Sequence, residues 1–87
     1  MKVTFTESAW DEYVSWQTED KKTLRNINRL IQDIQRNGLM SGRGKPELLK
    51  YVGTYSRRID EKNRLQYMKT DNGNVEIISC KGHYQDK

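Results

Sequence analysis

The sequence predicts an α+β fold of order β-α-α-β-β-β, in which a twisted antiparallel sheet is covered on one face by a two-helix hairpin. Apolar residues in the first half recur at helical spacing, whereas short extended segments alternate with turn signals in the second half. A loop at residues 38–46, with three glycines and the only proline, separates the halves. With 87 residues the chain has room for one domain, residues 1–87.

The first half begins with a short strand and an amphipathic helix. Residues 2–5 form the strand, with Val3 and Phe5 on one face. The helix begins near Ser8, because Ser8-x-x-Asp11 resembles a capping box. Its amphipathic face comprises Trp10, Tyr13, Val14 and Gln17.

The second helix has the clearest pattern in the chain. Residues 18–20 interrupt the first helix, and Asp20 can cap the helix that follows over residues 21–37. Gly38 is its expected C-terminal stop. Its apolar stripe comprises Leu24, Ile27, Leu30, Ile31 and Ile34. Two helices joined in this way must lay that stripe on a further layer.

Three strands are expected after the loop, over residues 55–59, 64–70 and 75–80, with Asn72-Gly73 centring the last turn. Residues 47–51 have no decisive pattern, and one helical turn is among the alternatives. The first turn leaves a second question open. A four-residue loop places Arg58 and Arg64 on opposite sheet faces, whereas a five-residue loop or a bulge places both on one face.

The positive charge is concentrated in the middle of the chain. Residues 42–69 carry eight cations and three acids, whereas the other residues carry a net charge of −1. Such focused charge favours a polyanion such as nucleic acid. A solvated basic surface is the alternative, and charge alone does not decide between them.

Composition excludes several classes of site. One cysteine, Cys80, and one histidine, His83, allow no intrachain disulfide and no convincing Cys/His zinc site, so no metal and no cofactor are expected. No apolar run is long enough for a membrane span or a signal peptide, so a cytoplasmic protein without membrane contact is expected.

The remaining polar residues suit metal-free cleavage of RNA. Glu47 is the only acid between residues 42 and 59, and His83-Tyr84 follows the last expected strand. In this reaction a base takes the proton of the 2′-OH, an acid protonates the leaving 5′-oxygen, and cations stabilise the phosphorane. The alternatives are ordinary: Glu47 forms a surface ion pair with Lys45 or Lys50, and Cys80 is a small buried apolar residue.

The order of these motifs resembles the YoeB (Txe/YoeB) family within the RelE/ParE toxin superfamily. The resemblance spans nearly the whole chain, at nearly the family spacing. The stretches that carry it are Glu7-Ser8-Ala9-Trp10-Asp11-Glu12-Tyr13, Trp16-Gln17, Asp20-Lys21-Lys22, Ile27-Asn28-Arg29-Leu30-Ile31, Gly42-Arg43-Gly44-Lys45-Pro46-Glu47-Leu48-Leu49-Lys50, Ser56-Arg57-Arg58-Ile59, Arg64-Leu65-Gln66-Tyr67 and Cys80-Lys81-Gly82-His83-Tyr84. The departures are a short connection between residues 50 and 56, Tyr55 for Trp, Asn63 for His, and the additional residues 85–87.

The resemblance implies the toxin of a type II toxin–antitoxin system, with a fold like that of microbial ribonucleases. Its implied activity is that of a ribosome-dependent endoribonuclease that cuts mRNA in the ribosomal A site without a metal and so inhibits translation. The implied partners are the ribosome and mRNA, a YefM-type antitoxin, a second copy of the chain in a homodimer, and operator DNA only indirectly through the antitoxin complex.

The resemblance also implies roles for individual residues. Glu47 matches the general base, His83 the general acid, Arg64 the residue that stabilises the transition state, and Tyr84 the residue that positions the substrate base. The family places Lys50 and Arg58 near the scissile phosphate. Weaker candidates for contact with the rRNA or mRNA backbone are Arg43, Lys45 and Arg57.

A second hypothesis is a non-enzymatic module, either a ParE-like inhibitor of a protein target or a basic RNA-binding domain. ParE-type relatives share the fold but lack the glutamate and the terminal histidine. Translation-dependent cuts in mRNA favour the nuclease, whereas DNA damage without such cuts favours the second hypothesis.

Overall fold

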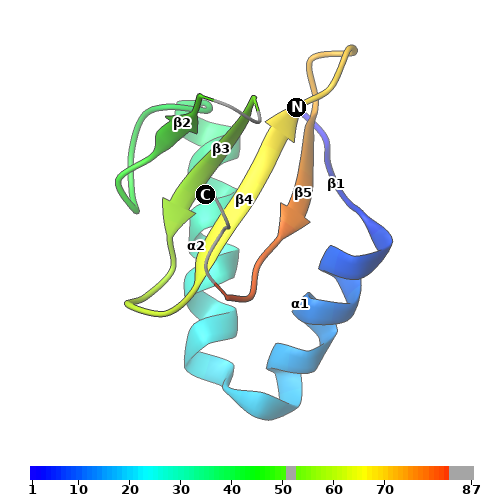
Figure 1. Cartoon of the computed structure of the whole chain (residues 1–87), viewed down its shortest axis with the longest axis vertical. Coiled ribbons are helices and arrows are strands. Elements are labelled where there is room, and N and C mark those ends of the chain that lie inside the picture. The colour runs from blue at the N-terminus through cyan, green and yellow to red at the C-terminus, as the bar shows by residue number, and fades with distance from the viewer. Residues whose placement is uncertain (51–52, 83–87) are drawn as a thin grey trace.

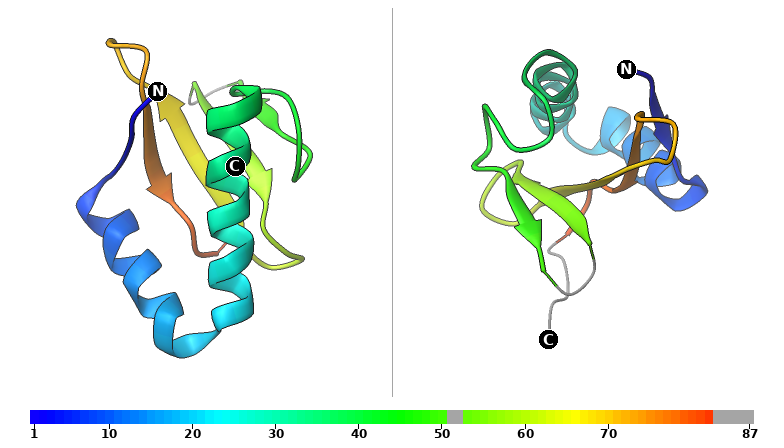
Figure 2. Two further views of the ribbon diagram at one scale, coloured as in Figure 1. Left: turned by 180° about the vertical axis from the view of Figure 1, so that it is seen from behind. Right: turned by 90° about the horizontal axis from the view of Figure 1, so that it is seen from above.

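The computed structural model describes residues 1–50 and 53–82. Two helices lie together on one face of a five-stranded sheet of order β1-β5-β4-β3-β2 (Figures 1 and 2). The α+β class and the helix hairpin on one face are therefore confirmed. The elements are β1 (Val3–Phe5), α1 (Glu7–Glu19), α2 (Lys21–Asn37), β2 (Glu47–Leu49), β3 (Thr54–Arg58), β4 (Arg64–Lys69) and β5 (Val75–Ser79).

The helix ends follow the capping chemistry of the sequence. Asp20 caps α2 as predicted, because its carboxylate accepts hydrogen bonds from the backbone N–H groups of Lys22 and Thr23. Gly38 ends α2 with φ 93°, a backbone conformation that suits glycine. The predicted cap at Ser8 is wrong. Thr6 is already extended as it leaves β1, and its side chain accepts the N–H of Ala9, so the cap lies two residues before Ser8 and α1 begins at Glu7.

The two helices differ in how well the sequence predicts their buried faces. On α2, Ile27, Leu30 and Ile34 are buried as expected. On α1 the buried residues are Ala9 and Trp16, whereas Trp10 is 50 % exposed. Trp10 instead packs beside the rings of Phe5 and Tyr13 at the margin of the sheet. Ala9 and Trp16 therefore form the buried contact of α1 with the core, Tyr13 packs against it, and Trp10 and Val14 are exposed.

The description of the sheet as purely antiparallel is wrong for one strand. β1 pairs in parallel with β5, with Val3 opposite Val75. In addition, residues 47–49 form β2, an antiparallel partner of β3, where one helical turn was an alternative. Each hairpin reverses the chain, so β3 and β5 run together, against β2 and β4, and β5 then runs in the direction of β1 (Figure 1).

The core lies between the sheet and the helices. Leu65, Tyr67, Val75 and Ile77 of the sheet are at most 1 % exposed and belong to one cluster with the buried residues of both helices. No helix of the described residues lies over the opposite face of the sheet (Figure 2). Neither described helix is long and apolar enough to cross a membrane.

Candidate active site

The open face of the sheet brings the predicted site residues of three strands together. Glu47 of β2 lies opposite Ser56 of β3, and Arg58 of β3 lies opposite Arg64 of β4. Residues directly opposite each other point to the same face. The loop between the two arginines is therefore the five-residue alternative, residues 59–63, and Arg58 and Arg64 share the open face.

Arg64 is at the centre of this cluster. Its Nη2 donates a hydrogen bond to Oε1 of Glu47 at 2.9 Å, and its Nε donates to Oγ of Ser56 at 2.8 Å. The Arg64 side chain is 15 % exposed, whereas the Glu47 side chain is 46 % exposed. Arg64 is thus fixed in position by two neighbouring strands, while the Glu47 carboxylate beside it stays open to an incoming group.

The last described residue, Gly82, is hydrogen-bonded to Arg64. The backbone N–H of Arg64 donates to the carbonyl of Gly82 at 3.0 Å, and the N–H of Gly82 donates to Oδ1 of Asn63 at 2.7 Å. Asn63 is itself held by Asp60, to which its amide donates. His83 and Tyr84, the predicted general acid and base-positioning residue, lie outside the described residues and directly follow Gly82 in the sequence.

Helix α1 fixes the two residues before Gly82. The indole Nε1 of Trp16 donates to the carbonyl of Cys80 at 3.0 Å, and the N–H of Cys80 donates to Oε1 of Glu12 at 2.8 Å. The ammonium group of Lys81 pairs with Glu19 at 2.7 Å and lies over the ring of Trp16. Two helical turns therefore hold the approach to the candidate site from the side of the core.

Cys80 is a buried apolar residue, as the sequence predicts, and its chemistry is suppressed. The side chain is fully buried, and burial raises the pKa of its thiol to about 12, with the charge of Glu12 adding to the shift. A thiol with such a pKa stays protonated at neutral pH and is a poor nucleophile.

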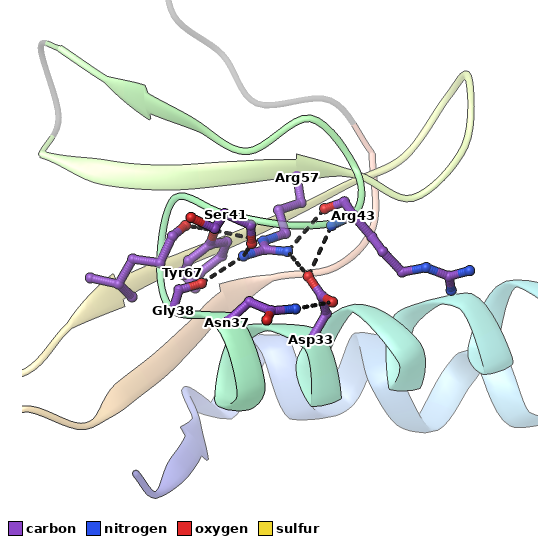
Figure 3. Close-up of polar contacts among 8 residues, drawn as sticks. Asp33, Asn37, Gly38, Ser41, Arg43, Arg57 and Tyr67 are labelled. Atoms are coloured by element: carbon purple, nitrogen blue, oxygen red, sulfur yellow. Dashed lines mark hydrogen bonds and ion pairs between the residues drawn. The ribbon is translucent and has the colours of Figure 1, made fainter.

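Arg57 does not lie on the open face. It is fully buried on the helix side, where its guanidinium donates to Asp33 at 2.7 Å, to Tyr67 at 2.9 Å and to three loop carbonyls (Figure 3). Those carbonyls belong to Gly38, Ser41 and Arg43. The predicted contact of Arg57 with the RNA backbone therefore has no accessible surface in this structure, and Arg57 instead holds the loop onto α2.

The pKa values of two partners of Arg57 are shifted in this environment. The backbone N–H of Arg43 and then the Arg57 guanidinium lower the pKa of the Asp33 carboxyl below its usual range. Burial raises the pKa of the Tyr67 phenol, and its hydroxyl donates to the carbonyl of Leu39. The loop that leads into β2 and Glu47 is thus fixed by a charged pair and by main-chain acceptors.

Comparison with known proteins gives the family. The model of the YoeB-like toxin of bacterial type II toxin–antitoxin systems matches residues 5–84. The chain belongs to the YoeB toxin family. It is 44 % identical to Toxin YoeB of Escherichia coli K12 over 86 residues, which is 97 % of this chain and 100 % of that protein.

Solved structures agree with this assignment. The YoeB dimer from Staphylococcus aureus is 44 % identical, with a TM-score of 0.87, and covers 97 % of this chain and 98 % of that one. A YoeB–YefM complex from Staphylococcus aureus is 43 % identical, with a TM-score of 0.85 over the same shares of both chains. The α+β fold of this chain is therefore the YoeB fold.

Within this YoeB fold, the remaining candidates lie on the surface. Arg58, Lys50, Lys45 and Arg43 are all exposed, and Lys45 has a positive φ of 51°. The sequence reasoning missed Ser56 and Asn63, which orient Arg64 and hold Gly82. One signal was present for Arg57: strand alternation places it on the face of Tyr55, which contacts the core.

Proposed function

We propose that this YoeB-family toxin is a ribosome-dependent endoribonuclease that cuts mRNA in the ribosomal A site by metal-free acid–base transesterification. The observation that carries the proposal is the Arg64 contact set. One residue holds Glu47 through its side chain and Gly82, the neighbour of His83, through its backbone N–H. A base, a cation and the chain segment that leads to the acid therefore meet at one point.

The first half of the reaction uses Glu47 and Arg64. Glu47 takes the proton of the ribose 2′-OH, and the 2′-oxygen forms a bond to the adjacent phosphorus. As Glu47 becomes neutral, the phosphorane gains the negative charge. Nη2 of Arg64 lies 2.9 Å from the Glu47 carboxylate. Arg64 can therefore stabilise first the carboxylate and then the phosphorane with little movement.

The second half uses the chain end. His83 gives a proton to the 5′-oxygen as the bond between phosphorus and that oxygen breaks, which leaves a 2′,3′-cyclic phosphate and a 5′-hydroxyl. Tyr84 stacks on the substrate base and holds the linkage in line. Both roles rest on the sequence and on the family resemblance.

The surrounding cations bind the polyanion. Arg58 lies opposite Arg64, and Arg58 and Lys50 are assigned to the phosphate at the cut. Arg43 and Lys45 contact the rRNA or mRNA backbone further away. All four side chains are exposed, so each is accessible to a phosphate.

The partners follow from the relatives. Because a Staphylococcus aureus relative is solved as a YoeB–YefM complex and another as a YoeB dimer, we expect a YefM-type antitoxin and a homodimer here. Operator DNA is then reached only through the antitoxin complex. The proposed target, the translating ribosome, places the toxin in the cytoplasm.

The test is mapping of mRNA ends in a translating extract. Wild-type protein cuts ribosome-bound message, and Glu47→Gln, Arg64→Lys and His83→Ala each lower the cleavage rate by roughly 10²–10⁴. Glu61→Gln is the matched control for Glu47, because Glu61 is an exposed acid in the turn beyond β3. Intact message with wild-type protein, or full cleavage by Glu47→Gln, would refute the proposal.

The same experiment separates the second hypothesis. A ParE-like inhibitor of a protein target arrests growth without cuts in mRNA and keeps its toxicity when Glu47 and His83 are both replaced. One described relative of the same fold is a YoeB/ParE toxin from Agrobacterium tumefaciens, 38 % identical. DNA damage without message cleavage would favour that class.

A further inference from the structure

A second basic site lies on the helix side of the molecule. A pocket of about 260 Å³ opens between α2, the loop before β2 and the end of β3. Its lining includes Asn26, Arg29 and Leu30 of α2, Arg43 and Gly44 of the loop, and Arg58. Arg29 and Asn26 belong to none of the site residues discussed above.

The walls of this pocket are rigidly built. The carbonyl of Gly44 accepts the N–H of Arg58 at 2.7 Å. A Cβ at Gly44 would lie 2.9 Å from Cδ2 of Leu30 and 3.0 Å from the carbonyl oxygen of Arg58, so only glycine allows this approach. Its φ of +82° sets the same requirement.

Arg43 is fixed on both sides of its peptide. Its N–H donates to Asp33 at 2.9 Å, and its carbonyl accepts from Arg57 at 2.9 Å. From this anchored backbone the Arg43 side chain extends along α2, away from the Arg57 contacts (Figure 3). The Arg43 backbone thus holds the loop, while the Arg43 guanidinium extends along α2.

The pocket has an excess of positive charge. Arg29, Arg43 and Arg58 are exposed, and none of them forms an ion pair within residues 1–50 and 53–82. Asp33 is the natural helical partner of Arg29 four residues earlier. Its Oδ2, however, is held by Arg57 and by the N–H of Arg43. Asp33, the acid at helical spacing from Arg29, is therefore already engaged by other donors.

We infer that this pocket binds a phosphodiester group of RNA, as a second anchor beyond the cut. The inference rests on the proposed function. Guanidinium groups recognise phosphate oxygens in a planar, bidentate way, and the Asn26 amide adds a neutral donor. Arg58 lies opposite Arg64 in the sheet and also lines the pocket, so the pocket lies at the end of β3, next to the candidate active site.

The test compares two arginines of the same helix. Arg29→Gln removes a pocket residue, and Arg25→Gln is the matched control, because Arg25 is exposed on α2 but does not line the pocket. The probe is a ten-nucleotide RNA with 2′-O-methyl groups, which cannot be cleaved because it lacks the attacking hydroxyl. Binding is followed by fluorescence anisotropy over a series of salt concentrations, with circular dichroism to check the fold.

Arg29→Gln should weaken binding roughly three- to tenfold and reduce the slope of log K against log salt by about 0.7, the value for one phosphate of a single strand. Arg25→Gln should leave this slope nearly unchanged. Equal effects of both variants would show diffuse charge and overturn the inference, as would no effect of Arg29→Gln.

A ten-residue polyglutamate is the second probe. If it binds as tightly as the RNA and loses as much affinity in Arg29→Gln, the pocket takes carboxylates of a protein and the phosphodiester assignment is wrong. The cleavage assay tests the proposed nuclease separately from the binding assay, which tests the pocket. Absent cleavage with an intact Arg29-dependent salt slope would refute only the nuclease, whereas cleavage with an unchanged slope would refute only the pocket.

Discussion

Replacement of Arg57 by methionine tests the arrangement that holds the loop before β2. Methionine retains most of the buried volume but removes the charge and all five donated hydrogen bonds. These bonds reach Asp33, Tyr67 and the three loop carbonyls. Because Arg57 is fully buried, the acceptors left behind are poorly reached by water.

The expected cost is large for a protein of this size. Removing one partner of a buried ion pair typically costs about 3–5 kcal/mol. At roughly 0.05–0.15 kcal/mol per residue, a domain of 87 residues has a total stability of about 4–13 kcal/mol. Arg57→Met should therefore remove about a quarter or more of the free energy of unfolding and lower Tm by about 12 °C or more.

Urea unfolding followed by circular dichroism and by tryptophan fluorescence measures this cost. Arg25→Met is the control, because it removes an exposed arginine from α2, and it should change the stability by less than about 0.5 kcal/mol. The double variant Arg57→Met/Asp33→Asn should recover part of the loss, since the stranded carboxylate is then neutral. A cost below about 1 kcal/mol for Arg57→Met would refute the structural role of this residue.

Three further predictions concern stability and reactivity. The pKa of Asp33 is lowered chiefly by the Arg43 N–H, so the contribution of Asp33 to the stability of the folded state is complete above the ordinary pKa of 3.8 and is lost as the pH falls through the lower folded value. Asp33→Asn should therefore flatten the decline of the urea midpoint at acid pH. An unchanged decline would contradict this. Gly44→Ala should cost about 1–3 kcal/mol in thermal unfolding and more than Gly73→Ala, because both have a positive φ but only Gly44 has close neighbours; equal costs would exclude the contact as the cause. Cys80, with its pKa raised to about 12 by burial, should resist a thiol reagent at pH 8 until urea unfolds the chain, and rapid labelling of the folded protein would argue against that burial.

Helix α2 shows what the sequence can predict. Its bounds agree with the prediction because a continuous apolar stripe, an Asp20 cap and a terminating Gly38 all act within the helix itself. The strand starts and ends of the meander were also near their predicted places. These signals are local, so no knowledge of the rest of the chain is needed to interpret them.

The direction of β1 and the presence of β2 were not predictable in the same way. β2 has three residues, too few to display a period, and its pairing depends on a partner beyond residue 53. The parallel pairing of β1 with β5 joins residues about 72 positions apart. Strand direction leaves no mark on the composition of so short a segment.

The candidate site also has parts that the sequence could predict and parts that it could not. The residue types and the family resemblance made Glu47 the candidate base and Arg64 the candidate cation, and the structure places their side chains 2.9 Å apart. The difference between Arg57 and Arg58, adjacent and chemically identical, depends on which sheet face each one occupies. Strand alternation favours the core side for Arg57. A buried arginine is stable there only because Asp33 and the loop carbonyls pair with its guanidinium.

The carbonyls around Arg57 have an evolutionary consequence. Leu39, Ser41 and Arg43 contribute to the loop through main-chain oxygens, and every amino acid supplies the same oxygen. Mutation can therefore alter the outward side chains of this loop while its shape is inherited intact, except at Gly42 and Gly44, where a Cβ would collide with Asp33 and with Leu30 respectively. Related lineages can in this way exchange surface chemistry beside the candidate site without rebuilding the scaffold.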